Sequence, residues 1–199
     1  MQKTFELLGR AFVGECQARN RYTFYASAAK KEGYELVAAV FAETADQEKQ
    51  HAKTFYTFLK ELMEKPENGE LVLPDLGVAI ALGTTVENLR GSVAGENEEA
   101  TQMYQELARV ATEEGYPQIA ARVKAIAEAE AYHRDRYSKL LEHLEAGEMF
   151  EQVDETTWVC RECGYRFVGK QPPVKCPSCE HPQAFFQRET EALVGAVNK

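Results

Sequence analysis

The sequence carries the same acid–imidazole pair twice, and this repeat limits the folds that the chain can adopt. Glu48 and His51 stand three residues apart, as do Glu130 and His133. Each pair also lies fifteen residues after the glycine of a Glu-Gly-Tyr tripeptide. Because residues at i and i+3 share one face of a helix, the repeat predicts two helical hairpins of the same design.

The residues around each pair predict four long helices. The chain before residue 147 is rich in the helix formers Ala, Glu, Leu and Lys. Gly33 and Gly115 suit the end of the first helix in each half, and Pro117 suits the start of the next. The dipeptide Gly14-Glu15 matches a second Gly-Glu at 95–96 with one residue of slippage. We expect helices at about 4–31, 35–64, 84–113 and 117–146.

The stretch 65–83 is too long for a tight hairpin. It predicts a partly apolar, packed crossover between the two helix pairs.

Helical periodicity turns a carboxylate inward on every helix. In the second and fourth helices the apolar residues alternate at steps of four and three, and both Glu-x-x-His pairs fall within these seams. Glu15 falls in the seam of the first helix. Glu96 falls in the expected seam of the third, which continues through Met103, and Glu99 follows one turn after Glu96.

Tyr22 and Tyr104 lie about two turns beyond Glu15 and Glu96, where they suit both core packing and a hydrogen bond to a metal-binding carboxylate.

Five inward carboxylates are untenable without compensating positive charge, because burying one unpaired carboxylate costs several kcal/mol. Two multivalent cations would supply that charge. The donor set matches di-metal sites of ferritin-like bundles, in which two helices give one Glu and two give Glu-x-x-His. Mixed oxygen and nitrogen ligands favour iron or manganese. A single Glu-x-x-His usually lies on a solvated face, but two in register favour the metal site. Glu99 is the weaker candidate, since Glu98 beside it suits the surface.

Near residue 147 the composition changes to paired cysteines, glycines and prolines. We therefore place a helical domain at 1–147 and a small metal-binding domain at 153–190. Its Cys-x-x-Cys, twelve residues, Cys-x-x-Cys pattern predicts a tetrahedral four-sulfur site, for which zinc and iron both remain open. The ligands would be Cys160, Cys163, Cys176 and Cys179.

The chain has 199 residues and a formal net charge of −9, which argues against nucleic acid or an anionic membrane as partner. It contains no apolar run long enough for a membrane span and no secretory signal pattern. We expect a cytoplasmic protein. Cys16 is expected to be a free thiol without a role, and His143 and His181 to be surface or structural residues.

On these motifs the chain resembles the rubrerythrins over nearly its full length. The residues that carry the resemblance are Gly14-Glu15, Glu48-x-x-His51, Glu96-x-x-Glu99, Glu130-x-x-His133, Cys160-x-x-Cys163-Gly164-Tyr165 and Cys176-Pro177-x-Cys179. The resemblance implies a mainly α protein, in which a ferritin-like four-helix bundle with a long crossover precedes a small rubredoxin-like domain of short β elements. It also implies two irons in the bundle and one iron bound by four cysteines, with zinc substitution possible at either site.

In that family, hydrogen peroxide is reduced to water in defence against oxidative stress. The resemblance implies that Glu48 and Glu130 bridge the irons, that Glu15 binds one iron, and that Glu96 and His133 bind the other. His51 and Glu99 would be alternative ligands to one iron, exchanging with redox state. The catalytic candidates are Glu99, His51, Tyr22 and Tyr104.

The family further implies a homodimer, with electrons passing from the four-cysteine iron of one subunit to the di-iron site of the other. The electron donor would be a rubredoxin, a ferredoxin or an NAD(P)H-dependent flavoprotein. The sequence has no Gly-rich nucleotide-binding motif, so we do not expect it to bind NAD(P)H directly. Two alternatives stay open: a ferritin-like iron oxidase or iron-handling protein, and a metal-stabilised scaffold with a zinc ribbon.

Overall fold

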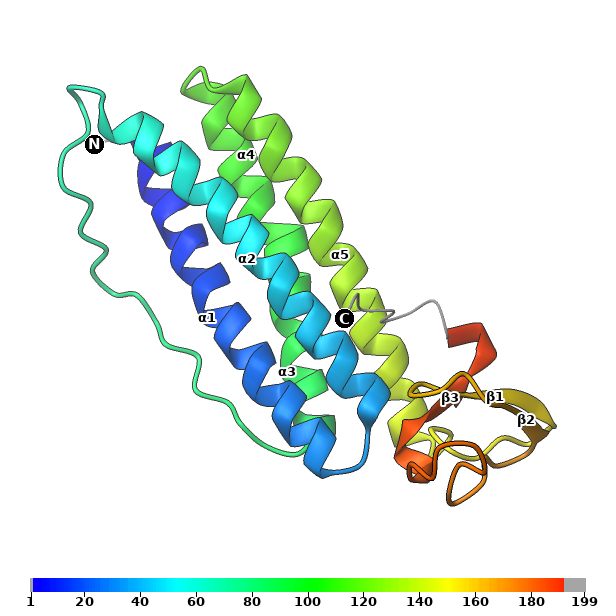
Figure 1. Cartoon of the computed structure of the whole chain (residues 1–199). Coiled ribbons are helices and arrows are strands. Elements are labelled where there is room, and N and C mark those ends of the chain that lie inside the picture. Colours follow the sequence, from blue (N-terminus) through cyan, green and yellow to red (C-terminus); the bar gives the residue numbers. More distant parts are fainter. Residues whose placement is uncertain (1, 192–199) are drawn as a thin grey trace.

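The computed structural model describes residues 2–191 and shows an elongated helical bundle with a small β module at one end (Figure 1). Two helices, α1 (Lys3–Lys31) and α2 (Glu35–Met63), form the first hairpin. The second hairpin joins α3 (Thr85–Glu98) and α4 (Tyr104–Glu113) to α5 (Pro117–Glu145). The expected four-helix bundle with a long crossover is therefore confirmed.

The two hairpins are held together by reciprocal caps at their Glu-Gly-Tyr turns. Gly33 and Gly115 adopt φ angles of 84° and 83°, which glycine tolerates at a helix end. The glutamate before each glycine caps a helix of the other half. Glu32 accepts a hydrogen bond from the Thr85 backbone N–H at the start of α3. Glu114 accepts bonds from the first backbone N–H groups of α1, where the helix dipole also favours negative charge.

The third helix of the bundle is not continuous, and here the expected seam is wrong at one position. Between α3 and α4 the chain forms a π turn, Glu99–Met103 (η1), in which the Tyr104 N–H donates to the Glu99 carbonyl five residues earlier. The wider turn accommodates one extra residue and rotates everything that follows. Met103 is therefore 38% exposed, and Tyr104 is buried in its place. This extra residue also explains the slippage between the two halves of the sequence.

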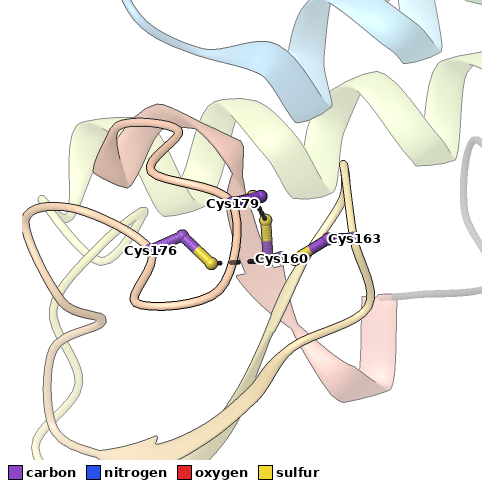
Figure 2. Close-up of side chains that lie close together, drawn as sticks. All are labelled: Cys160, Cys163, Cys176 and Cys179. Atoms are coloured by element: carbon purple, nitrogen blue, oxygen red, sulfur yellow. Dashed lines mark hydrogen bonds between the residues drawn. The ribbon is translucent and has the colours of Figure 1, made fainter.

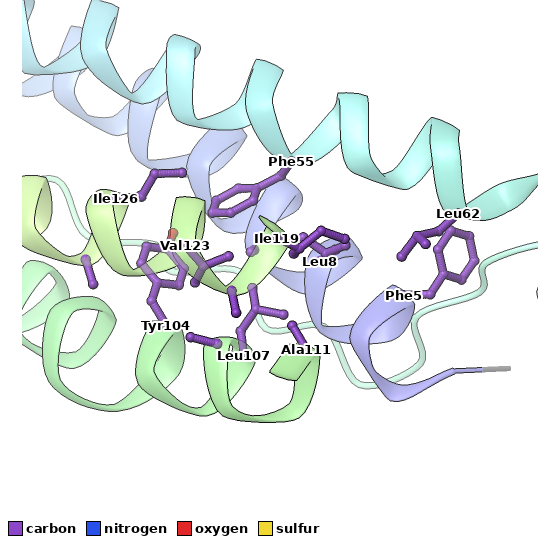
Figure 3. Packing of buried hydrophobic residues seen from close by; sticks show 14 residues of the cluster. Phe5, Leu8, Phe55, Leu62, Tyr104, Leu107, Ala111, Ile119, Val123 and Ile126 are labelled. Atoms are coloured by element: carbon purple, nitrogen blue, oxygen red, sulfur yellow. The ribbon is translucent and has the colours of Figure 1, made fainter. Parts of the chain in front are cut away.

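Two apolar clusters fill the bundle and leave its middle to polar groups. The cluster farther from the β module packs Phe5, Phe55 and Leu107 with neighbours from α1, α2, α4 and α5 (Figure 3). The cluster nearer the module contains Tyr25, Phe41 and other residues of α1, α2 and α5. The inward glutamates lie between these clusters, so packed rings on both sides screen them from water along the bundle axis.

The crossover between α2 and α3 runs as an extended chain along the side of the bundle beside α1 (Figure 1). Its first part packs as expected, because a Cβ on Gly9 would collide with the Leu71 side chain. The later part differs from the expectation of a packed segment. Val78, Ile80 and Leu82 are 70%, 91% and 68% exposed.

The β module has three antiparallel strands in the order β2-β1-β3. They are β1 (Thr156–Cys160), β2 (Arg166–Gly169) and β3 (Phe186–Arg188). Trp158 and Phe186 are buried with two cysteines in a core of its own. The domain boundaries drawn from composition stay predictions.

Candidate metal centres

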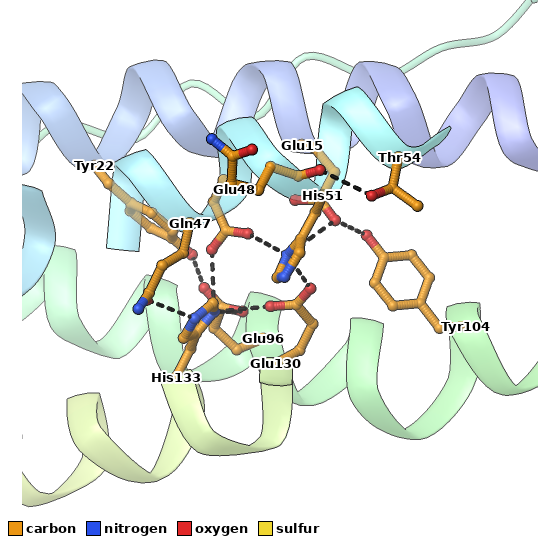
Figure 4. Close-up of polar contacts among 11 residues, drawn as sticks. Glu15, Tyr22, Gln47, Glu48, His51, Thr54, Glu96, Tyr104, Glu130 and His133 are labelled. Carbon is orange, nitrogen blue, oxygen red and sulfur yellow. Dashed lines mark hydrogen bonds and ion pairs between the residues drawn. The ribbon is translucent and has the colours of Figure 1, made fainter. Parts of the chain in front are cut away.

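The bundle brings six acid and imidazole side chains together as two overlapping groups of four (Figure 4). Both groups contain Glu48 from α2 and Glu130 from α5. One adds Glu15 and His51, and its potential ligand atoms lie within 4.8 Å of one another. The other, at the same spacing, adds Glu96 and His133.

The two shared carboxylates give one oxygen to each group. His51 Nδ1 lies 2.8 Å from Glu130 Oε1 and 2.9 Å from Glu48 Oε2. His133 Nδ1 lies 2.8 Å from Glu130 Oε2 and 3.1 Å from Glu48 Oε1. Glu48 and Glu130 can therefore each offer one oxygen to either member of a metal pair. The bridging role that the family resemblance implies for them stays a prediction.

The terminal carboxylates occupy the two ends of this arrangement. Glu15 Oε1 lies 3.8 Å from His51 Nδ1, and Glu96 Oε2 lies 3.6 Å from His133 Nδ1. Neither carboxylate is exposed to solvent. Each is the fourth member of one group, so the site has one terminal acid on each side of the shared pair.

Without cations, the electrostatics of this site are unbalanced. Burial and the Glu48 and Glu130 carboxylates raise the pKa of Glu15, and they raise that of Glu96 to about 8. Burial opposes ionisation of Glu48 as well, but hydrogen bonds to His133 and His51 lower its pKa to about 2. In the opposite sense, hydrogen bonds to Glu130 and Glu48 overcome burial and raise the pKa of His51 to about 9. In the metal-free site, protons on Glu15, Glu96 and His51 therefore supply part of the positive charge that bound cations would otherwise supply.

The unpaired atoms fit a pair of hard cations. Apart from the contacts within the site given above, several buried atoms have no hydrogen-bond partner among the described residues, namely Glu15 Oε2, Glu48 Oε1, Glu96 Oε2, both Glu130 carboxylate oxygens and His133 Nδ1. Orphaned buried acceptors cost about 1–3 kcal/mol each. All are ligand types that iron accepts, and their oxygen-rich mixture suits iron better than a thiolate-preferring metal. The residues present therefore fit a di-iron centre.

The two tyrosines singled out in the sequence cross the bundle to the opposite half. The Tyr22 hydroxyl donates to Glu96 Oε1, and the Tyr104 hydroxyl donates to Glu15 Oε1. Both phenols are buried, and burial together with nearby carboxylates raises their pKa values. Each terminal carboxylate is thus oriented by a protonated phenol.

Sequence reasoning missed Gln47, which holds the second imidazole. Its Oε1 lies 3.0 Å from His133 Nε2, so a proton on Nε2 leaves Nδ1 free to face the carboxylates. The residue immediately precedes Glu48. Nothing in the sequence marks it, because its partner is on another helix.

Glu99 lies near the site but outside both groups of four. It is half-buried on the π turn, and its Oε1 comes within 3.9 Å of the place where Gly14 would carry a Cβ. Burial and the carboxylates of Glu96 and Glu130 raise its pKa. In this structure His51, and not Glu99, belongs to the group with Glu15. The exchange of these two residues as ligands to one iron stays a prediction.

The four paired cysteines also converge (Figure 2). Cys160 Sγ lies 3.7 Å from Cys179 Sγ, and Cys163 Sγ lies 3.7 Å from Cys176 Sγ. These distances exclude disulfides, whose sulfurs lie about 2 Å apart. They match the edge of a tetrahedron of about 3.8 Å that follows from metal–sulfur bonds of about 2.3 Å. The cysteines therefore fit one tetrahedral metal ion.

The remaining candidates lie away from these centres. His143 is half-buried at the end of α5, where its Nε2 lies 2.7 Å from Arg188 and its Nδ1 lies 3.2 Å from Glu191. It therefore helps to tie the β module to the bundle. His181 packs on Phe185 in the module. Cys16 is a free, half-buried thiol whose pKa is raised by burial.

No helix in residues 2–191 is long and apolar enough to cross a bilayer.

Comparison with known proteins assigns both parts of the chain. A family model described as Rubrerythrin matches residues 6–141, and one described as Rubrerythrin, rubredoxin-like domain, matches residues 158–187. The rubrerythrin of Porphyromonas gingivalis is 51% identical over 185 residues, which cover 93% of this chain and 89% of that protein. The structure of nigerythrin in its fully reduced, all-ferrous state has a TM-score of 0.62 at 30% identity, covering 94% of this chain and 87% of that one. A bacterioferritin of Desulfovibrio desulfuricans shares the fold at 23% identity, with a TM-score of 0.65 over 73% of this chain and 82% of that chain.

Proposed function

The chain belongs to the rubrerythrin family, and on this premise we propose that it is a non-haem di-iron peroxidase that reduces hydrogen peroxide to water. The family resemblance expected from the sequence is confirmed. Membership, together with the two metal centres, supports a role in iron handling and oxidative stress. The peroxidase reaction is the finer part of the proposal.

One observation carries this proposal. The same chain brings together two overlapping groups of acid and imidazole side chains, which share two carboxylates, and one group of four cysteines. Two irons bound between Glu48 and Glu130 would supply both electrons for cleavage of the O–O bond in one encounter. The four-sulfur site would hold a one-electron carrier. A protein that only oxidises or stores iron has no need of that carrier.

The protein's own residues would orient the ligands and retain protons. Each peroxide consumes two electrons and two protons and yields two waters. The Tyr22 and Tyr104 hydroxyls would hold the terminal carboxylates in fixed rotamers and keep their own protons, since burial raises their pKa values. The packed clusters on both sides would exclude bulk water. Glu99, on the π turn, would bind one iron in place of His51 when the redox state changes.

We also propose a cytoplasmic homodimer that receives electrons from a donor protein. The donor would be a rubredoxin, a ferredoxin or an NAD(P)H-dependent flavoprotein. Electrons would pass from the four-cysteine iron of one subunit to the di-iron site of the other. Reduced, metal-binding cysteines suit the cytoplasm. Zinc at either site would leave the fold intact and stop electron transfer, because zinc has no redox chemistry.

Rapid mixing of the anaerobically reduced, iron-loaded protein with hydrogen peroxide tests the proposal. Visible absorbance should report fast reoxidation by peroxide and much slower reoxidation by O2. The reverse preference would replace the peroxidase by an iron oxidase. No response after verified iron loading at all three positions would favour a metal-stabilised scaffold.

A further inference from the structure

A second polar contact joins α2 to α5 beside the one that holds His133. In the first contact, Gln47 on α2 bonds to His133 on α5 (Figure 4). On α2, Glu43 lies four residues before Gln47. On α5, Arg136 lies three residues after His133. Residues at these spacings share one face of a helix. Arg136 Nη2 donates to Glu43 Oε2 at 2.6 Å, so an ion pair lies one turn from a predicted metal ligand.

The two members of this ion pair differ in their exposure to water. The Arg136 side chain is 6% exposed, whereas the Glu43 side chain is 31% exposed. Among the described residues, Arg136 Nε and Nη1 have no hydrogen-bond partner. An arginine guanidinium keeps its positive charge in proteins. Water therefore screens the negative charge of the pair better than the positive charge, and the pair is not neutral when seen from the protein interior.

The exposed Tyr132 links this buried charge to the metal site. The Arg136 guanidinium carbon lies 5.2 Å from the centre of the Tyr132 ring, within the range of a cation–π contact. The centre of the same ring lies 6.4 Å from the centre of the His133 ring. The guanidinium and the His133 imidazole are therefore neighbours of one aromatic ring, at the side of the site that contains Glu96.

We propose that Arg136 and Glu43 form an oriented charge pair that sets the reduction potential of the bundle irons, with the arginine raising it and the glutamate lowering it. The inference rests on the two bundle irons of the proposed function, but not on peroxide as the oxidant. Each ferric iron takes one electron from the donor protein and loses one unit of positive charge. A buried positive charge nearby favours that change, because charges in the interior are screened less than in water. Arg136 would thus act on the irons through its charge, without binding them.

Potentiometric titration of the full-length, iron-loaded protein, followed by visible absorbance, tests the inference. Arg136→Met should shift the reduction equilibrium of the bundle irons about tenfold toward the ferric form, or about 59 mV lower for a one-electron step. Glu43→Gln should shift it the opposite way, by about threefold, because its charge is better screened. Arg136→Lys keeps the charge and should restore most of the original potential. The four-cysteine iron is an internal reference, and its potential should stay the same in every variant.

Another ion pair between helices provides the matched control. Arg90 on α3 and Glu145 on α5 lie 2.6 Å apart, with side chains 60% and 43% exposed. Glu145 lies twelve residues after His133, which is about 18 Å along the helix. Arg90→Met and Glu145→Gln should therefore leave the potential of the bundle irons unchanged.

Opposite shifts from the two members of the pair would support a role of their charges. If the pair only ties α2 to α5, Arg136→Met and Glu43→Gln should move the potential in the same direction or not at all, and either result would overturn the inference. So would an Arg136→Lys potential as low as that of Arg136→Met. If Arg136→Met does not fold, Glu43→Gln decides alone, since an upward shift supports the inference and an unchanged potential overturns it.

The outcome is separate from that of the peroxidase proposal. Opposite shifts in a protein that peroxide reoxidises slowly would remove the peroxidase proposal and leave the charge pair standing. Fast reoxidation by peroxide without opposite shifts would do the reverse. A bundle that binds no iron would overturn both.

Discussion

The two halves of the bundle are built from the same parts, but they differ in two features that concern Glu99 and His51. Each half supplies a terminal carboxylate, a tyrosine that reaches the other half's carboxylate, a capping glutamate and a Glu-x-x-His pair. The shared framework explains how two metals can be held alike. The departures from it indicate how the two metals come to behave differently.

The first departure is the π turn of the second half. Glu99 lies three residues after Glu96, and the matching residue three after Glu15 is the buried Ala18. The extra residue leaves Glu96 and Tyr104 facing inward and adds a fifth carboxylate beside them. π turns occur often at functional sites for this reason, since they redirect side chains without ending a helix.

The second departure concerns what holds each imidazole. His133 is fixed through Nε2 by Gln47, the residue before Glu48. The residue before Glu130 is Ala129, which has no side-chain group that could bond to His51. Within residues 2–191, the Nε2 atom of His51 has no hydrogen bond, whereas its Nδ1 contacts the shared carboxylates. Of the two histidines, His51 is thus the one free to leave its position, which matches its proposed exchange with Glu99.

Removing a shared carboxylate should have the largest effect, because both groups of potential ligands lose a member. Glu130→Ala should lower the iron bound in the bundle from two to none, a loss of affinity of at least about 100-fold, while the four-cysteine iron stays. Metal analysis and visible spectra distinguish the two centres. Glu128→Ala, an exposed change on the same helix, is the control. Retention of both bundle irons in Glu130→Ala would exclude Glu130 as a bridging ligand.

Removing Glu99 should make the two halves more alike and slow the reaction. Glu99→Ala should keep the fold and both bundle irons but reduce the rate of reoxidation by peroxide about 10-fold or more, because the alternative ligand is missing. Stopped-flow absorbance measures the rate. The neighbouring Glu98→Ala, on the exposed side of α3, should leave it unchanged. Equal rates in the two variants would remove Glu99 from the mechanism.

The second departure can be reversed by removing the glutamine that bonds to His133 and by introducing one that can bond to His51. Gln47→Ala should weaken iron binding at the His133 position by about 10–100-fold, as for other residues that orient a metal ligand. Ala129→Gln should give His51 a partner, preserve iron content and slow peroxide turnover several-fold. Iron titration and turnover assays separate these effects. If both variants changed only thermal stability, the role assigned to Gln47 would be merely structural.

In the metal-free protein, the terminal carboxylates of both halves should make stability fall as pH rises. The pKa of Glu96 is raised by burial from 4.5 to about 8, so the folded state holds a proton that the unfolded state has lost between these values. We expect the Tm of the metal-free protein to drop by at least about 3 °C from pH 5 to pH 8. Glu96→Gln should reduce this slope. The iron-loaded protein should show the opposite trend, because metal binding requires deprotonated ligands.

The smallest effect should come from the reciprocal caps, and it should be similar in both halves. Glu32→Gln and Glu114→Gln each weaken a cap on the other half's first helix, at a cost of about 0.5–1 kcal/mol. Thermal denaturation of the two variants measures the cost, with the exposed Glu142→Gln as control. A large effect from one cap alone would show that the two hairpins do not support each other equally.

Local periodicity was enough to predict most of this architecture. Four helices, their inward carboxylates and the four-cysteine cluster all follow from the spacing of residues along single elements, because a helix fixes the direction of each side chain from its own sequence. One residue of slippage hinted at the π turn. It did not reveal where the turn lies, so Met103 was wrongly placed in the inward seam, although Tyr104 beside it was expected near the site.

The features that only the tertiary structure decided all depend on partners from distant segments. Gln47 is an ordinary surface-type residue until α5 brings His133 beside it, and Glu32 and Glu114 are turn residues until the opposite hairpin brings free N–H groups to them. The exposure of Val78, Ile80 and Leu82 likewise cannot be read from an apolar stretch that could equally have been packed. The sequence by itself determined the donor groups and their helices. The tertiary structure decided their partners, because hydrogen bonds between segments depend on how those segments meet in space.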